Sequence, residues 1–179
     1  TNDMLSIMAN GLAGNAEITE EGEAFDAFCL GLQTVTNELC RMIAKDGEGA
    51  TKLIECHVDG AADKSTARTV AKSVICSSLF KSAMYGADAN WGRVLCAIGY
   101  SGADVDVSKI DVDFVSSNGM ISVCRDGSGI PFSEEIAKEV LTADEVKVMI
   151  GLNSGEESAV AWGCDLTYDY VKINGDYRS

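Results

Sequence analysis

The spacing of hydrophobic residues along the chain alternates between the period of a helix and that of a strand. Several segments repeat their apolar residues every three or four positions, which is the period of one helix face. Capping residues such as threonine and serine open some of these segments, and Asp46-Gly47 stops the first. The predicted helices are residues 19–45, about 65–80, a short helix that opens at Asp88 or Asn90, and 133–141.

Other segments alternate apolar and polar residues or are short apolar runs, and these predict strands. LIECHVDGA predicts a strand, and IDVDFVSSNGMISVCRDG predicts a hairpin that turns at Asn118-Gly119. EVKVMIGL and SAVAWGCDLT predict a second strand pair, joined by the turn Asn153-Ser154-Gly155. The first apolar segment, MLSIMANGLAG, predicts a strand or a short buried segment that closes in a turn at Asn10-Gly11.

Alternating helices and strands predict a mixed α and β fold. The 179 residues contain no internal repeat and no composition shift that would mark a linker, so we expect one domain over 1–179. No apolar run approaches the roughly 20 residues of a membrane-spanning helix, so no membrane partner is expected. The tail YDYVKINGDYRS is dense in tyrosine and charge, and we expect it to be tucked into the structure.

Charge and cysteine content narrow the class of partner and the compartment. The formal net charge of −14 would repel a phosphate backbone, which argues against nucleic acid and leaves small cationic or zwitterionic substrates. The seven cysteines are odd in number, form no C-x-x-C pair and lie mostly in apolar runs. They predict reduced, buried side chains in a cytoplasmic protein. Nothing has the spacing of a metal site, so no metal or resident cofactor is expected.

Three single residues are candidates for chemistry. Thr1 carries the α-amino group, and an N-terminal threonine can be a nucleophile whose own amine is the base. His57 is the one histidine, and no carboxylate partner for it is evident from the sequence, so we interpret it as structural. Glu48 lies between two glycines directly after a predicted helix. It is either a solvated loop acid or a carboxylate that binds an ammonium group.

Three longer motifs together resemble one enzyme family. DGEGATKLIE, YGADANWGRVLCAIGYSG and AWGCDLTYDYVKING, in this order, are similar to the ornithine acetyltransferases, also called glutamate N-acetyltransferases. The similarity extends over essentially the whole chain. It implies a layered αββα fold like that of N-terminal nucleophile hydrolases, with different connectivity.

The resemblance also implies a reaction and partner chains. Family members cut themselves into an α and a β chain, commonly assembled as a heterotetramer, and the first β residue is the threonine nucleophile. It carries an acetyl group from N-acetylornithine to glutamate, and some members also use acetyl-CoA as donor. TNDML matches a motif that comes a few dozen residues after this nucleophile. We therefore expect the nucleophile upstream of this chain rather than at Thr1, and the oxyanion hole in the α chain.

Three substrate positions of the family fall on this chain. Glu48 matches a glutamate that contacts substrate, Asn174 matches an asparagine that does so, and Ser179 stands where the family usually has threonine. The serine keeps the hydroxyl and loses a methyl group. Two other functions stay open at this point: an amidohydrolase or aminopeptidase of related fold, and a non-catalytic structural subunit.

Overall fold

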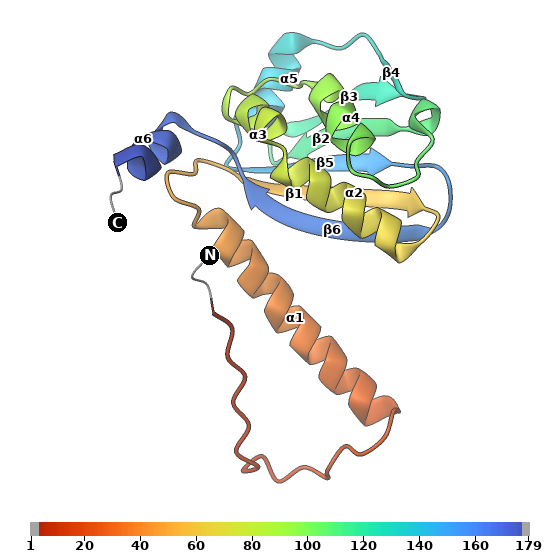
Figure 1. The fold of residues 1–179 in the computed structure, drawn as a ribbon, viewed down its shortest axis with the longest axis vertical. Coiled ribbons are helices and arrows are strands. Elements are labelled where there is room, and N and C mark those ends of the chain that lie inside the picture. The colour runs from red at the N-terminus through yellow and green to blue at the C-terminus, as the bar shows by residue number, and fades with distance from the viewer. Residues whose placement is uncertain (1–3, 177–179) are drawn as a thin grey trace. The chain divides into compact units, whose positions relative to one another are not determined.

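The computed structural model of the protein describes residues 4–176, so Thr1 and Ser179 lie outside the described residues. The strands are β1 (Leu53–Ala61), β2 (Asp111–Ser116), β3 (Gly119–Arg125), β4 (Ser128–Gly129), β5 (Glu145–Gly151) and β6 (Glu157–Cys164). The helices are α1 (Glu23–Lys45), α2 (Lys64–Cys76), α3 (Ser78–Tyr85), α4 (Trp91–Gly99), α5 (Glu134–Leu141) and α6 (Tyr168–Asp176), with a short 3₁₀ turn at Val107–Lys109. Figure 1 shows these elements, and they confirm the mixed α and β class.

The chain forms two compact units, Thr1–Asn37 and Glu38–Ser179. In the first unit, residues 4–22 form neither helix nor strand, and side chains such as Met4 and Met8 are exposed. The expected strand or buried segment is therefore wrong, because the described residues of this unit contain no second strand to pair with it. The turn is present, since the Leu12 N–H donates to the side-chain oxygen of Asn10 over 3.1 Å.

Helix α1 confirms the first predicted helix, although it begins at Glu23, later than the expected Thr19. It ends at Lys45, directly before the expected stop. Within the described chain, no residue of α1 is buried. Its apolar face is exposed and consists of Phe25, Phe28, Leu32, Val35, Leu39, Met42 and Ile43.

The second unit is built on one mixed sheet with the strand order β4-β3-β2-β5-β1-β6. Strand β1 runs parallel to β5 and antiparallel to β6. The predicted pairing of β5 with β6 is therefore wrong, since β1 lies between them. Most of β1 is buried on both faces, and such a strand belongs inside a sheet rather than at its edge.

The hairpin of β2 and β3 is confirmed, with a small shift at its turn. Ser116 pairs with Gly119, so the two loop residues are Ser117 and Asn118 rather than Asn118 and Gly119. Helix α5 begins at the expected cap, Ser133, whose hydroxyl accepts from the Ile136 N–H. These short-range features follow from local turn and capping chemistry.

The predicted single helix over 65–80 is wrong, because Ser77 divides it into α2 and α3. Ser77 has an extended backbone; its N–H donates to Val74 O over 3.1 Å, and its hydroxyl accepts from the Phe80 N–H over 3.3 Å. The same residue therefore ends one helix and caps the next. Asn90, one of the two expected caps, opens α4.

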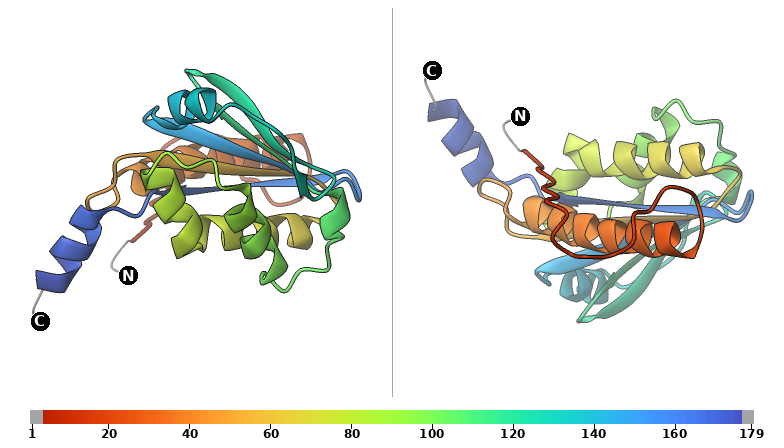
Figure 2. Two further views of the ribbon diagram at one scale, coloured as in Figure 1. Left: turned by 90° about the horizontal axis from the view of Figure 1, so that it is seen from above. Right: turned by 90° about the horizontal axis from the view of Figure 1, so that it is seen from below.

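Helices α2, α3 and α4 cover one face of the sheet, as the two views of Figure 2 show. Alternate residues of β1, Ile54, Cys56 and Val58, point into the core beneath them and are completely buried. The expected burial of the cysteines holds only for Cys56 and Cys124. All seven are free thiols; Cys164 is partly exposed, and the exposed ones are Cys29, Cys40, Cys76 and Cys96. No helix in residues 4–176 has both the length and the apolar character needed to cross a bilayer.

Candidate functional site

The structure brings Glu48 and Asn174 into direct contact, although 126 residues separate them in the sequence. The amide nitrogen Nδ2 of Asn174 donates to Oε2 of Glu48 over 3.0 Å. Glu48 lies in the loop 46–52 between α1 and β1, and Asn174 lies on α6, which follows the end of β6 (Figure 1). Both side chains are exposed, so a solute can reach them. The position of Ser179, the third expected contact, lies outside the described residues.

The hydrogen bonds of this pair leave acceptors for a ligand. Asn174 Nδ2 also donates to the backbone oxygen of Tyr170 over 3.0 Å, so both amide hydrogens are engaged. Within the described part of the chain, neither Asn174 Oδ1 nor Glu48 Oε1 takes part in a hydrogen bond. A carboxylate beside an amide oxygen is a set of acceptors, which suits a positively charged donor such as an ammonium group.

Two buried side chains fasten the loop that carries Glu48. The carboxylate of Asp165 accepts from the Thr51 N–H over 2.8 Å, from the Lys52 N–H over 3.0 Å and from the Thr51 hydroxyl. The hydroxyl of Thr167 donates to Gly49 O over 2.7 Å and accepts from the Tyr170 N–H over 3.1 Å. The sequence interpretation missed both, because the loop residues that they bind lie more than a hundred residues earlier. The contact of Thr167 with the Tyr170 N–H is local, and a threonine before the tail is a signal that could have indicated a helix cap there.

Lys52 ties the far end of the loop to α3. Its ammonium group donates to Met84 O over 2.8 Å at the C-terminal end of that helix, where a cation is favoured. Burial lowers the pKa of Lys52, against the opposing effect of Asp165 and Asp144. Together with Asp165, this contact holds the loop at its end next to β1.

We expect the change Gly49→Ala to disturb this site. Gly49 has a left-handed φ of +67°, and an added Cβ would lie 2.8 Å from Tyr170 N, a backbone atom that cannot rotate away. Strain and overlap together should lower the free energy of unfolding by about 2 kcal/mol. Thermal unfolding measures this, with Gly99→Ala as the control, since nothing lies within 4 Å of a Cβ there. An unchanged melting temperature for Gly49→Ala would contradict the close approach of α6.

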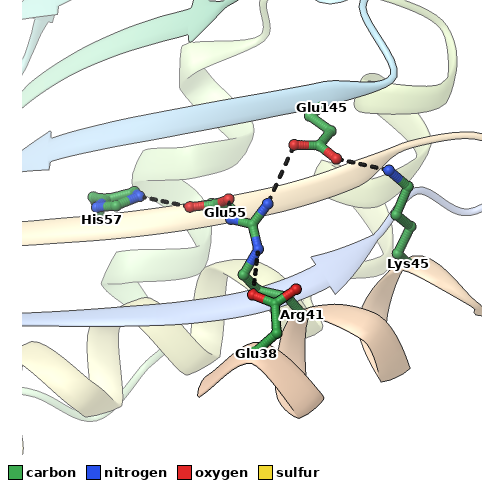
Figure 3. A network of polar contacts seen from close by, with 6 residues as sticks. All are labelled: Glu38, Arg41, Lys45, Glu55, His57 and Glu145. Carbon is green, nitrogen blue, oxygen red and sulfur yellow. Dashed lines mark hydrogen bonds and ion pairs between the residues drawn. The ribbon is translucent and has the colours of Figure 1, made fainter. Parts of the chain in front are cut away.

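A second polar cluster lies on the face of β1 opposite the core (Figure 3). Glu55, only 5% exposed, is paired with Arg41 and accepts from His57 Nε2 over 3.1 Å. Arg41 also reaches Glu145 over 3.2 Å, and Lys45 pairs with the same carboxylate over 2.7 Å. The sequence interpretation missed Glu55, because nothing in the sequence indicates which residue pairs with a charged side chain in an apolar strand.

The contacts in this cluster give His57 a structural role. Burial and the nearby Lys147 lower the pKa of His57, and Asp59 opposes them. A neutral ring can then donate from Nε2 to Glu55. Cys56 points to the other face of β1, into the core, and burial raises the pKa of its thiol. The arrangement therefore contains no Cys56–His57 dyad, as strand geometry predicts.

Comparison with known proteins identifies the family. The model of the ArgJ family matches residues 1–179, which is the whole chain. The chain belongs to the ArgJ family. This membership confirms the resemblance to the ornithine acetyltransferases that the three sequence motifs indicate.

The whole chain aligns with relatives in the ArgJ family. It is 52% identical over 179 residues to the arginine biosynthesis bifunctional protein ArgJ 1 of Clostridium acetobutylicum, covering 100% of this chain and 44% of that protein. It is 51% identical to the ArgJ protein of Caldanaerobacter subterraneus subsp. tengcongensis, with the same coverage. The chain thus spans less than half the length of these ArgJ relatives.

A solved ArgJ structure has the same fold. The crystal structure of the arginine biosynthesis bifunctional protein ArgJ from Bacillus halodurans superposes with a TM-score of 0.90 at 48% sequence identity. The match covers 99% of this chain and 82% of that chain. The ArgJ fold is therefore shown for essentially the whole chain.

Proposed function

We propose that this chain is part of an acetyltransferase that moves an acetyl group from N-acetylornithine to glutamate in arginine biosynthesis. One observation carries the proposal to specific residues: Glu48 and Asn174, which the family resemblance assigns to substrate, lie in hydrogen-bond contact. The names of the relatives, arginine biosynthesis bifunctional proteins, support the pathway.

The proposed reaction is a two-step acyl transfer through a threonine. A threonine outside this chain attacks the acetyl carbonyl of N-acetylornithine, ornithine leaves, and glutamate then takes the acetyl group from the threonine ester. Oxyanion-hole donors from the partner α chain stabilise the charge on the carbonyl oxygen. The chemistry needs no metal and no resident cofactor, and acetyl-CoA is an alternative acetyl donor.

The residues of this chain bind and orient the amino-acid substrates. Glu48 pairs with a substrate ammonium group, and Asn174 and Ser179 hold the amino-acid end by hydrogen bonds. A net charge of −14 fits substrates that carry an ammonium group. In the proposed assembly, this chain works with the α chain of the same precursor as a heterotetramer in the cytoplasm.

Acceptor dependence tests this function in the full-length protein. Beyond the first equivalent per active site, we expect release of ornithine from N-acetylornithine to require glutamate and to yield equal amounts of N-acetylglutamate, measured by chromatography. Release of equal amounts of acetate without glutamate would instead identify an amidohydrolase. No turnover by the folded, assembled protein would favour a structural subunit.

Mass spectrometry with peptide mapping locates the nucleophile in the same material. Brief exposure to N-acetylornithine should add one acetyl group to a segment upstream of this chain. An acetyl group on a peptide from within residues 1–179 would overturn the placement of the nucleophile.

A further inference from the structure

We propose that Asp165 and Thr167 are positioning residues for substrate binding, which act by holding Glu48 and Asn174 at a fixed separation. The proposal rests on the proposed function, because it assigns these two residues a role in the same site. Neither Asp165 nor Thr167 is exposed enough to contact substrate, with 2% and 4% of their surfaces accessible.

Asp165 holds the backbone of the loop that carries Glu48. Its Oδ1 accepts the N–H groups of both Thr51 and Lys52, and its other oxygen accepts the Thr51 hydroxyl. A buried carboxylate that accepts several hydrogen bonds holds its donors firmly, since each contact is charge-assisted. If the loop shifted away from the end of β6, the buried carboxylate of Asp165 would lose its hydrogen-bond donors, which is unfavourable.

Thr167 joins the loop to the helix that carries Asn174. One hydroxyl group donates to Gly49 O, next to Glu48, and accepts from the Tyr170 N–H in the first turn of α6. The second bond is an N-cap, which sets where the helix begins and how it is directed. Tyr170 in turn accepts from the Asn174 amide one turn later. A continuous hydrogen-bonded path thus runs from Glu48's neighbour to Asn174.

The absence of a side chain at Gly49 makes this path short. The backbone of α6 packs directly on the loop, because an added Cβ at Gly49 would lie 2.8 Å from Tyr170 N and 3.0 Å from the backbone carbon of Asp169. Both substrate residues are exposed and could not hold each other in place by one surface contact. Their geometry comes from the buried pair beneath them.

Thr167→Val tests the proposal because valine keeps the shape and removes both hydrogen bonds. In the assembled full-length protein, we expect the KM for N-acetylornithine and for glutamate to rise about tenfold, while kcat falls less than about threefold. Thr167→Ser keeps the hydroxyl and should restore KM. Asp165→Asn keeps Oδ1 as acceptor for the two backbone N–H groups, so this variant should change KM by less than Thr167→Val does.

Thr142→Val is the control at a distant threonine. The Thr142 hydroxyl, directly after α5, also donates to a backbone carbonyl, Lys138 O, over 3.0 Å. This substitution should leave KM unchanged. A Thr167→Val protein that melts at a lower temperature with wild-type KM would show a structural role alone and overturn the proposal.

A double-mutant cycle separates this inference from the proposed function. If Thr167 acts through Glu48, then Thr167→Val should raise KM in the wild-type background and add little in a Glu48→Ala background. Effects that simply multiply would overturn the positioning role while leaving the function of Glu48 intact. An unchanged KM in Glu48→Ala alone would refute the substrate site itself.

Discussion

Glu48→Ala should reduce kcat/KM for acetyl transfer by about 100-fold or more while leaving the protein folded. The substitution removes the carboxylate that would pair with the substrate ammonium, and a charge-assisted contact of this kind contributes about 2–3 kcal/mol. The fold should survive because Glu48 is exposed and its one bond within the described residues is to the Asn174 amide. Steady-state kinetics of the full-length protein and its melting temperature measure the two effects.

Two further variants make the result specific to the Glu48 site. Glu156→Ala removes another exposed glutamate from a loop of the same unit and should leave kinetics at the wild-type level. Glu48→Gln keeps the shape and removes the charge, so it should be closer to Glu48→Ala than to wild type. Near-normal kinetics for Glu48→Ala would remove this residue from the substrate site.

Of the substitutions described, Arg41→Met should cause the largest loss of stability, about 3 kcal/mol in the free energy of unfolding. The change leaves the Glu55 carboxylate buried on β1 without its cation (Figure 3). His57 alone cannot replace it, since burial lowers the pKa of that imidazole and favours the neutral ring. Chemical denaturation followed by circular dichroism measures the change.

The control for Arg41→Met is Lys45→Met, which removes the cation from an exposed pair with Glu145. An exposed ion pair contributes less than about 1 kcal/mol, so this variant should be nearly as stable as wild type. The double change Arg41→Met with Glu55→Leu should recover most of the lost stability, because it removes both charges at once. If Arg41→Met alone is as stable as wild type, the ion pair does not hold this part of α1 on the sheet.

Local chemistry made much of the fold predictable from sequence. Caps such as Asn90 and Ser133 and the hairpin between β2 and β3 depend on residues a few positions apart. The errors in the predicted elements occur where the structure depends on more than the neighbouring residues. Ser77 was one polar residue inside a helical period, and its capping of two helices depends on how the flanking helices pack.

Long-range pairing was the part that sequence patterns could not supply. Strands β5 and β6 are neighbours in the chain with a turn between them, but β1 lies between them in the sheet. In the site, family resemblance selected Glu48 and Asn174, and no spacing rule placed them together. Asp165 and Thr167 were missed for the same reason, because the loop residues that they bind are distant in sequence.

The central place of β1 also sets an order of events during synthesis. Leu53 pairs with Glu145 on one side and with Cys164 on the other, so β1 leaves the ribosome long before either neighbour exists. At roughly 5–20 residues per second, its apolar segment waits about 5–20 seconds for its partners. The proposed substrate site, which needs both the loop before β1 and the helix after β6, is among the last features of this chain to form.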